Sequence, residues 1–460
     1  MNLMDEPTIE EWMDRHHVEI VRTHATTLEG AAVGKYLNRP KFLASLPEGH
    51  NIGDIALDTD IAGSPHMSFW SDTRHGGAGR IVMRPDVDSI VSDGTDPNLG
   101  HCLCDFTDVE GNEISLCPRT LLKKITGEVD ELGYTVKAAF ELQFFIFKNT
   151  FDHARRGEYQ NLDPVTASTS SNIYLLRNAH NAKPFMDEVV KRLNWQRFAW
   201  ESWSGEGGVG QVALNFSPTD PVKAADTVVR VKQLIYEVAL NLGMSVTFMA
   251  SIRQGHGNGL HVHHALQEKE VAPAFRDNDE KNALLKNWIA GITATMAGAT
   301  SMLCPTVNAY RRLTEFTSSP VTASWAKENK TTGLSVISRA DNLVSIEHRL
   351  PTGDANPYLV LAVILAGGLA GAKKDLPPPE ALKRVGSGLP QDEPRLPDSV
   401  MSAAEALAAD TMLGETLGQN VIDYWTSTRK LEWLSFQSEC GDINAKTTTQ
   451  WEYNRYFELL

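Results

Sequence analysis

Two apolar segments each carry side chains that can bind a metal ion or move a proton. Glu141 and Gln143 alternate in FELQFFIF, so in a strand both would project from the same face. His261 and His263 alternate in the same way in GNGLHVHHAL, whereas His264 would point to the opposite face. Neutral imidazole suits divalent transition-metal ions, and a carboxylate inside an apolar strand needs a cation or a donor. Glu141 is a candidate metal ligand or catalytic acid, with a core salt bridge as the alternative. The pair His261 and His263 is a candidate for metal binding, with structural histidines as the alternative.

Two further segments combine acid and guanidinium groups. Glu347 and Arg349 share one face of SIEHRLPTGDANPYL, and Arg311 and Arg312 are adjacent in NAYRRL. A guanidinium fork can hold a substrate carboxylate through two hydrogen bonds. The alternatives are a surface ion pair, which stabilises little, and an exposed basic turn.

The helices and strands that position these residues can be predicted from hydrophobic periodicity and from turn residues. The first part of the chain predicts a helix over residues 7–17 and strands over 18–22, 81–83 and 102–106. The remainder predicts strands over 135–147, 210–216, 245–250 and 260–266, and helices over 118–132, 221–242 and 279–297. We predict an α+β fold with a small N-terminal domain over residues 1–115 and a large domain over 116–460. The Pro- and Gly-rich segment 376–398 is expected to be a surface excursion.

Composition excludes several functional classes. The formal net charge of −15 over 460 residues disfavours binding to nucleic acid or to anionic membranes. Five cysteines without a paired framework suit a reducing compartment, and Cys102 and Cys104 are expected to be core thiols. The acidic N-terminus has no apolar signal region, and the apolar segment 358–369 is too short to span a bilayer. A cytoplasmic protein is therefore expected.

Taken together and in this order, the motifs resemble those of glutamine synthetases, particularly the γ-glutamyl-amine ligase branch. The matching segments are FELQFFIF, EGGVGQVAL, GNGLHVHHAL, NAYRRL, WAKENKT and IEHRLPTGDANPYLVLAVILAGGLAG. The resemblance implies a β-grasp-like N-terminal domain and a catalytic domain with a curved antiparallel sheet and flanking helices. It also implies a homo-oligomeric ring, from octamer to dodecamer, with active sites shared between subunits. Enzymes of the family use two divalent ions, ATP and glutamate, and they form γ-glutamyl phosphate before an amine displaces the phosphate.

The resemblance indicates that this chain keeps the ligands of one of the family's two metal sites but not those of the other. The residues of one site correspond to Glu141, His261 and Glu347, and all three are kept. The three carboxylates of the other correspond to Gln143, Glu206 and Ala213, so only Glu206 is kept. Because Mg²⁺ prefers charged oxygen ligands, the second site is expected to bind it poorly.

Several cationic residues that contact ATP in the family are also replaced in this chain. Asn329 and Lys330 stand where the family has Asn-Arg, and Ser335 and Ser345 replace phosphate-facing arginines. The lysine that precedes the H-x-H loop corresponds to Ser251 or a neighbour. Phosphoryl transfer depends on cations that neutralise charge, so each loss removes support for ATP chemistry. Arg253, Arg311 or Arg339 is a candidate replacement cation, and the flap glutamate falls at Ser318.

The carboxylate side is better preserved, because Arg312 and Arg349 match the glutamate-binding arginines of the family. His263, His256 or His264 could serve as an acid, a base or a further ligand. The aromatic residues Trp70 and Trp203 hint at an altered pocket, with core or interface positions as the alternative.

The favoured interpretation is a single-metal enzyme that acts hydrolytically or oxidatively on a small amine, carboxylate or γ-glutamyl-type substrate. One histidine with two carboxylates resembles a non-haem iron centre, so Fe, Mn or Zn is expected, and ATP binding is doubtful. The alternative is an ATP-dependent γ-glutamyl-amide ligase that uses Mg²⁺. A third hypothesis is a non-catalytic regulatory ring protein.

Overall fold

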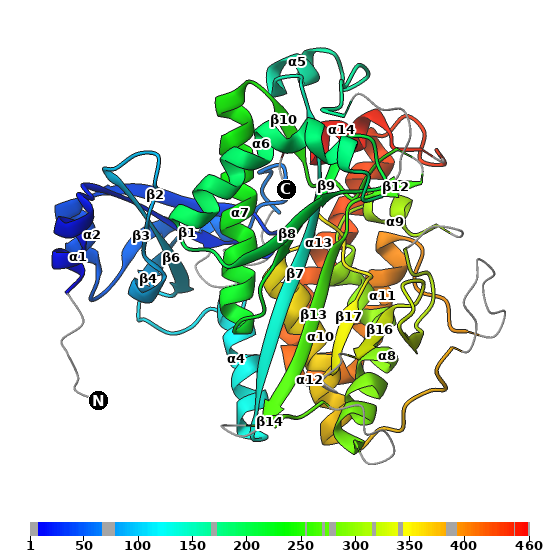
Figure 1. The fold of residues 1–460 in the computed structure, drawn as a ribbon. Coiled ribbons are helices and arrows are strands. Elements are labelled where there is room, and N and C mark those ends of the chain that lie inside the picture. The colour runs from blue at the N-terminus through cyan, green and yellow to red at the C-terminus, as the bar shows by residue number, and fades with distance from the viewer. Residues whose placement is uncertain are drawn as a thin grey trace.

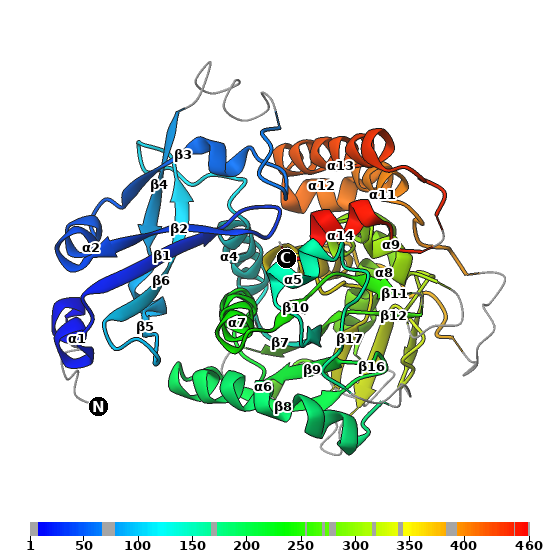
Figure 2. The ribbon, with the colours of Figure 1, turned by 90° about the horizontal axis from the view of Figure 1, so that it is seen from above.

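The computed structural model describes residues 8–66, 79–166, 173–253, 255–268, 272–275, 282–314, 319–338, 344–382, 393–445 and 447–458. Within these residues a smaller sheet near the N-terminus stands beside a larger sheet that is covered by helices (Figure 1). Helix α7 (Pro221–Leu242) lies between the two sheets when the molecule is seen from above (Figure 2).

The N-terminal sheet has the strand order β2-β1-β6-β4-β3, with β5 paired to β6. Its strands are β1 (Ile20–Thr26), β2 (Ala32–Asn38), β3 (His50–Gly53), β4 (Arg80–Pro85), β5 (Val91–Ser92) and β6 (Leu99–Thr107). Helices α1 (Ile9–His16) and α2 (Arg39–Ser45) bury Met13 and Phe42 against Val21 and Cys102. The short turns η1 (Asp54–Leu57) and η2 (Val87–Ser89) complete this part. Cys102 and Cys104 are both buried, as expected for core thiols.

The large sheet has the order β15-β16-β17-β13-β7-β9-β8, with β10 paired to β7 and β14 to β13. The central strands are β7 (Tyr134–Phe147), β9 (Gln211–Phe216), β13 (Leu260–Glu268) and β17 (Val344–His348). The outer ones are β8 (Trp200–Gly205), β10 (Ser245–Thr247), β14 (Ala272–Pro273), β15 (Trp325–Lys327) and β16 (Leu334–Ser338). Pairing is antiparallel except between β15 and β16. A separate hairpin joins β11 (Ser251–Arg253) to β12 (His256–Gly257).

One face of the large sheet is buried under helices, which leaves the other face for the polar side chains. The covering helices are α4 (Pro118–Glu131), α7, α8 (Ala283–Leu303) and α10 (Pro357–Lys373). The rest are α5 (Phe151–Arg156), α6 (Leu176–Trp195), α9 (Ala309–Arg312), α11 (Val400–Ala409), α12 (Thr411–Leu417), α13 (Gln419–Glu439) and α14 (Gln450–Tyr456). Helix α10 is apolar all round and is buried along almost its whole length.

Glycines allow α8 and α10 to approach closely. A Cβ atom at Gly291 would lie 2.1 Å from the carbonyl oxygen of Gly367 and 2.6 Å from Cα of Gly371. Since no side chain fits there, these glycines set the distance between the two helices. No helix in the described ranges is long and apolar enough to cross a membrane.

The elements that the sequence predicted are present in the structure, but some of their ends differ, and several helices and strands were not predicted, among them α6 (Leu176–Trp195) and α13 (Gln419–Glu439). Helix α7 covers the predicted range, whereas α8 begins four residues later and continues to Leu303. Strand β10 ends at Thr247 rather than at residue 250, because the chain then turns into the β11–β12 hairpin. Part of the predicted surface excursion, residues 383–392, lies outside the described residues.

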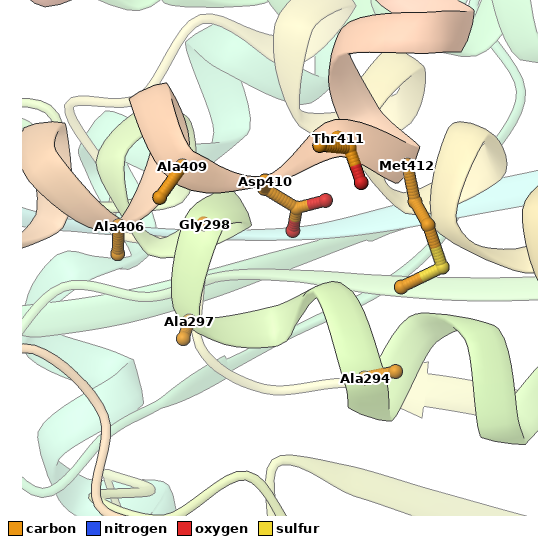
Figure 3. Close-up of a pocket in the computed structure, with 8 residues that line it drawn as sticks. All are labelled: Ala294, Ala297, Gly298, Ala406, Ala409, Asp410, Thr411 and Met412. Atoms are coloured by element: carbon orange, nitrogen blue, oxygen red, sulfur yellow. The ribbon is translucent and has the colours of Figure 1, made fainter.

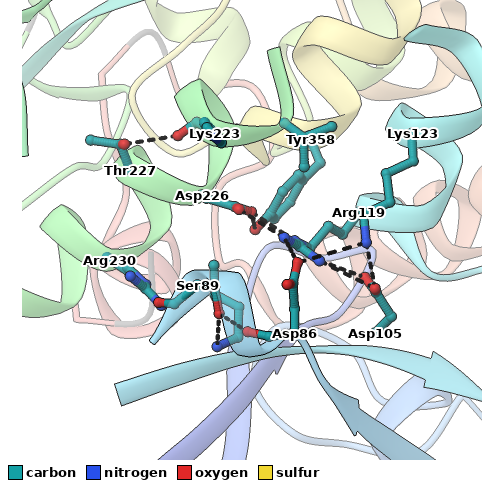
Figure 4. A network of polar contacts seen from close by, with 12 residues as sticks. Asp86, Ser89, Asp105, Arg119, Lys123, Lys223, Asp226, Thr227, Arg230 and Tyr358 are labelled. Atoms are coloured by element: carbon teal, nitrogen blue, oxygen red, sulfur yellow. Dashed lines mark hydrogen bonds and ion pairs between the residues drawn. The ribbon is translucent and has the colours of Figure 1, made fainter. Parts of the chain in front are cut away.

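A network of charges joins the N-terminal sheet to the helices (Figure 4). Arg119 on α4 donates from Nε and Nη2 to the two Asp226 oxygens of α7, at 2.8 and 2.9 Å. Its other hydrogen bonds reach Asp105 on β6 and Asp86, which follows β4. The Tyr358 hydroxyl of α10 donates to Asp226 at 2.6 Å. One guanidinium therefore links two strands of the N-terminal sheet to two helices.

Candidate active site

Strand register places the candidate metal ligands on one face of the large sheet. Glu141 on β7 is paired with His261 on β13, and His263 is paired with Glu347 on β17. Side chains that are opposite each other in an antiparallel pair project to the same side. His264 points to the other face, where its Nε2 accepts a hydrogen bond from Trp288 Nε1 at 3.0 Å. The alternation predicted from the sequence therefore matches the geometry of β13.

The carboxylates of Glu141 and Glu347 both lie near the same ring nitrogen of His261. His261 Nδ1 lies 3.1 Å from Glu141 Oε1 and 3.8 Å from Glu347 Oε1. Burial, reinforced by the nearby Arg349, lowers the pKa of His261, so the ring is neutral at pH 7. Burial disfavours the charged form of Glu141, but its interactions with His261, which include a hydrogen bond, and the nearby His263 and Arg349 lower the pKa of this carboxyl to about 2. Two carboxylates and a neutral imidazole fit a divalent ion.

The two carboxylates nevertheless already accept hydrogen bonds from neighbouring side chains. The Arg349 guanidinium is paired with Glu347 Oε1, and Gln143 Nε2 donates to Glu141 Oε1 at 3.1 Å. In the described part of the chain, no group of three or more His, Cys, Asp and Glu side chains is arranged so that it could hold a metal ion. A metal ion would have to displace these donors.

The residues that correspond to the second metal site do not fit a divalent ion. Both ends of the Gln143 amide are engaged, because its Oε1 also accepts from the Gly259 N–H at 2.8 Å. Ala213 is buried opposite Gln143 in the sheet and offers no ligand atom. Burial, together with the charge of Glu141, raises the pKa of Glu206 to about 7. One half-protonated carboxyl is a poor site for Mg²⁺.

The two adjacent arginines of α9 have different surroundings. Arg311 forms hydrogen bonds with Glu452 of α14 and with the Ala445 carbonyl, so it anchors the C-terminal segment. These contacts favour a structural role for Arg311 over the predicted role as a substrate clamp. Arg312 is buried and donates to the Leu350 carbonyl at 3.0 Å. It also donates to the Arg349 carbonyl at 3.2 Å and lies 3.4 Å from His261 Nε2.

The candidate ATP-side residues have different surroundings. The Asn329 side chain accepts hydrogen bonds from the backbone and hydroxyl of Thr331, which fixes its own turn. Lys330 is exposed, and its charge acts on both Glu206 and His263. Arg253 is exposed on β11.

Three other positions of interest, Ser318, Arg339 and Trp70, lie outside the described residues. Ser335, which replaces an arginine of the family, is buried opposite Glu347 in the register of β16 and β17.

Sequence reasoning missed the residues that fix the loop before His261. Asn258 donates to the carbonyl groups of Thr247 and Met249, and Gln211 donates to the Asn258 side chain at 2.9 Å. A Cβ atom at Gly259 would lie 2.5 Å from His261 Nε2, so only glycine fits beside the imidazole. The Gly-Asn-Gly sequence was the available signal, because a polar residue between two glycines suggests a loop held by its own side chain.

A separate hollow lies on the helical side of the molecule. It has a volume of about 310 Å³ and is lined by α8 and by residues of the segment 406–412 (Figure 3). None of the candidate site residues lines it. It therefore has no part in the site on the sheet.

The comparisons with known proteins agree with this geometry. Residues 115–456 match the family model described as the catalytic domain of glutamine synthetase. The chain belongs to the glutamine synthetase family. The expected α+β fold is confirmed, because a ligand-free structure named GmaS superposes with a TM-score of 0.80 at 22% identity. That superposition covers 97% of this chain and 98% of GmaS.

Several glutamine synthetase relatives are named for amine ligation. A glutamate–isopropylamine ligase of Pseudomonas sp is 28% identical over 81% of this chain and 82% of its own length. A γ-glutamylethanolamide synthetase of Streptomyces coelicolor is 26% identical over 88% and 85%, respectively. A γ-glutamylputrescine synthetase of Escherichia coli is 27% identical over 93% and 91%. The resemblance to the γ-glutamyl-amine branch is thus confirmed.

Proposed function

We propose that the protein is a carbon–nitrogen ligase that joins glutamate, or a closely similar acid, to an amine at the expense of ATP. The observation that carries this proposal is the convergence of Glu141, His261 and Glu347 beside Arg349. Relatives that are named as ligases or synthetases of γ-glutamyl amides, and that match this chain over most of their length, support the proposal. The hydrolytic or oxidative reaction, favoured from the sequence alone, has no support in these comparisons, which favour the ligase alternative.

In this proposal Glu141, His261 and Glu347 hold one divalent ion, Mg²⁺ or Mn²⁺. The ion would neutralise charge on the transferred phosphoryl group. Lys330 is an exposed cation whose charge acts on Glu206 and His263, so it is our candidate for contacting a phosphate. Glu206, with a pKa of about 7, is suited to take the proton from the nitrogen of the attacking amine, because a base near the working pH is efficient. His263, with a pKa lowered by burial, is the second candidate base.

A second candidate, a non-catalytic ring protein, is favoured by the residue types at three positions. Gln143 and Ala213 place an amide and a methyl group where the family has carboxylates, and Ser335 occupies the position of an arginine. A protein of this kind would keep the fold and bind a small acid without transferring phosphate. In both cases we propose a homo-oligomeric ring, in line with the family.

The deciding experiment combines calorimetry with product analysis. Wild-type protein is titrated with ATP in the presence of Mg²⁺ and then of Mn²⁺. ADP release is followed with glutamate and a panel of amines from ammonia to putrescine. We expect ADP and a γ-glutamyl amide to form in equal amounts, and we expect neither from the His261→Ala variant. Nucleotide binding without ADP in any combination would support the non-catalytic ring, and the absence of nucleotide binding would exclude the ligase.

A further inference from the structure

Four buried polar atoms at the interface between the N-terminal sheet and α7 have no hydrogen-bond partner among the described residues. They are Nε of Arg22, Nε2 of His24, Nδ1 of His101 and Nε of Arg230. His24, His101 and Arg230 are only 5%, 2% and 8% exposed, so bulk water does not solvate them. Because a buried polar atom without a partner is costly, this group of atoms calls for a bound ligand.

The strand register places the four side chains together. Arg22 and His24 are two residues apart on β1, so they share one face, and His101 of β6 is paired with Arg22. Arg22 forms an ion pair with Glu237, so this face is turned towards α7. Arg230 lies about two turns before Glu237 on the same helix. The charges of both arginines act on both histidines, which makes the four side chains close neighbours.

The positive charge of Arg230 is not compensated by a carboxylate of its own. Its Nη2 donates to the Ser89 carbonyl group (Figure 4). Asp226, on the same helix, already accepts two hydrogen bonds from Arg119 and one from Tyr358. Burial lowers the pKa of Arg230 below its ordinary value, and the charge of Asp226 does not offset this effect. A water molecule would leave the charge uncompensated, so the interface favours a ligand with negative charge.

His101 adds a requirement for a hydrogen on the ligand. Burial disfavours the charged form of Asp93, but its hydrogen bonds with His101 and Thr95 lower the pKa of this carboxyl below its ordinary value. A carboxylate only accepts, so His101 Nε2 donates to Asp93 Oδ2 at 2.8 Å. Burial lowers the pKa of His101 in spite of Asp93, so the ring is neutral at pH 7. Nδ1 of His101 therefore accepts, whereas Nε of each arginine donates.

We propose that this interface binds a small oxyanion that carries a hydrogen, such as hydrogen phosphate or bicarbonate. Its oxygens accept from Nε of Arg22 and of Arg230, and its O–H group donates to Nδ1 of His101. Sulfate has the charge but no hydrogen at neutral pH, so it should bind more weakly. The anion connects β1 and β6 to α7 and thereby stabilises the attachment of the N-terminal sheet. None of these residues belongs to the candidate active site.

Anomalous diffraction from crystals of the whole chain locates the anion directly. Crystals grown without phosphate are soaked in arsenate, a hydrogen-bearing analogue of phosphate, or in selenate, the analogue of sulfate. We expect an arsenic peak beside Arg22, His101 and Arg230, and a selenium peak of much lower occupancy. A water molecule there in the arsenate crystals, or arsenic only at other positions, overturns the proposal. Equal occupancy by selenate would also overturn it, because the O–H group would then have no role.

Thermal melting at pH 7 and constant ionic strength gives a second measurement in solution. With phosphate or bicarbonate at about 100 times its Kd, we expect the wild-type Tm to rise by about 3 °C, and sulfate to raise it less. The rise should be lost in Arg230→Met and kept in Arg84→Met, which changes an exposed arginine of β4. A rise with only phosphate or only bicarbonate supports the proposal and identifies the anion.

The control also separates this site from the proposed ligase function. Phosphate bound at the candidate active site would raise the Tm of both variants alike. An equal rise in all three proteins would therefore contradict the anion site, whatever the outcome of the ligase assay. If Arg230→Met does not fold, the crystals of the wild-type chain still decide the question.

Discussion

Replacing Arg119 with methionine should loosen the attachment of the N-terminal sheet. Methionine keeps most of the aliphatic volume but leaves Asp86, Asp105 and Asp226 without their shared cation. The side chain of Arg119 is 6% exposed, so water cannot replace it easily. The perturbation therefore acts on three carboxylates at once while changing the packing little.

The expected loss in the free energy of unfolding depends on how deeply the three carboxylates are buried. Asp226 is 12% exposed, and Asp86 and Asp105 are 23% and 21% exposed, so each reaches some solvent after the change. Removing one partner of a buried ion pair costs about 3–5 kcal/mol, and partial exposure favours the lower value of about 3 kcal/mol. With an unfolding entropy of roughly 1 kcal/mol per kelvin for a chain of this length, we expect Tm to fall by about 3 °C.

The matched control is Lys123→Met, one turn further along α4. Lys123 Nζ lies 2.6 Å from the same Asp105, but its side chain is 41% exposed. An exposed pair contributes less than about 1 kcal/mol, so this variant should melt close to the wild type. The two substitutions differ mainly in the burial of the cation.

The effect should also depend on pH. Burial raises the pKa of Asp86, but the charge and hydrogen bond of Arg119 outweigh it and leave this pKa below the ordinary value of 3.8. A carboxyl with a depressed pKa stabilises the fold above its unfolded pKa, and the contribution is lost as the pH falls through the folded value. The difference in Tm between wild type and Arg119→Met should thus be full at pH 7 and shrink below about pH 4.

Scanning calorimetry at pH 7 and at pH 3.5 measures both expectations on the three proteins. Equal melting temperatures for Arg119→Met and Lys123→Met at pH 7 would refute the reasoning, because burial would then have no influence. A difference that persists unchanged at low pH would show that lost packing, and not charge pairing, causes it.

Three further predictions concern the site, the helices and the assembly. His261→Ala should abolish Mn²⁺ binding measured by calorimetry, whereas Glu206→Ala should weaken it only mildly; equal losses would indicate two metal ions. Gly291→Ala should lower Tm, at a cost of about 1–3 kcal/mol, because the added methyl group meets Gly367 and Gly371 of α10; an unchanged Tm would mean that α8 and α10 can separate freely. Light scattering should show a ring-sized assembly of eight to twelve subunits, and a monomer would contradict shared active sites.

Local signals in the sequence were sufficient for the family and for some of the central elements, such as α7 and β13. Helix α7 begins as predicted because Asp220 caps it and Pro221 occupies its first turn, and it ends at Gly243 in the left-handed region. The strand alternation in GNGLHVHHAL separated His261 and His263 from His264 because side chains in a strand alternate between faces. These features depend on neighbours within a few residues, so no tertiary information was required.

The surroundings of the arginines could be decided only by the tertiary structure. Arg311 and Arg312 are adjacent on a single turn of helix, yet one meets Glu452 near the C-terminus and the other meets His261 on the sheet. The pairing of Arg349 with Glu347 likewise depends on rotamers in a buried space. Partners that are distant along the chain are selected by packing and by the register of three strands. The sequence by itself therefore determined which charged side chains are present, and the fold decided which partners each of them contacts.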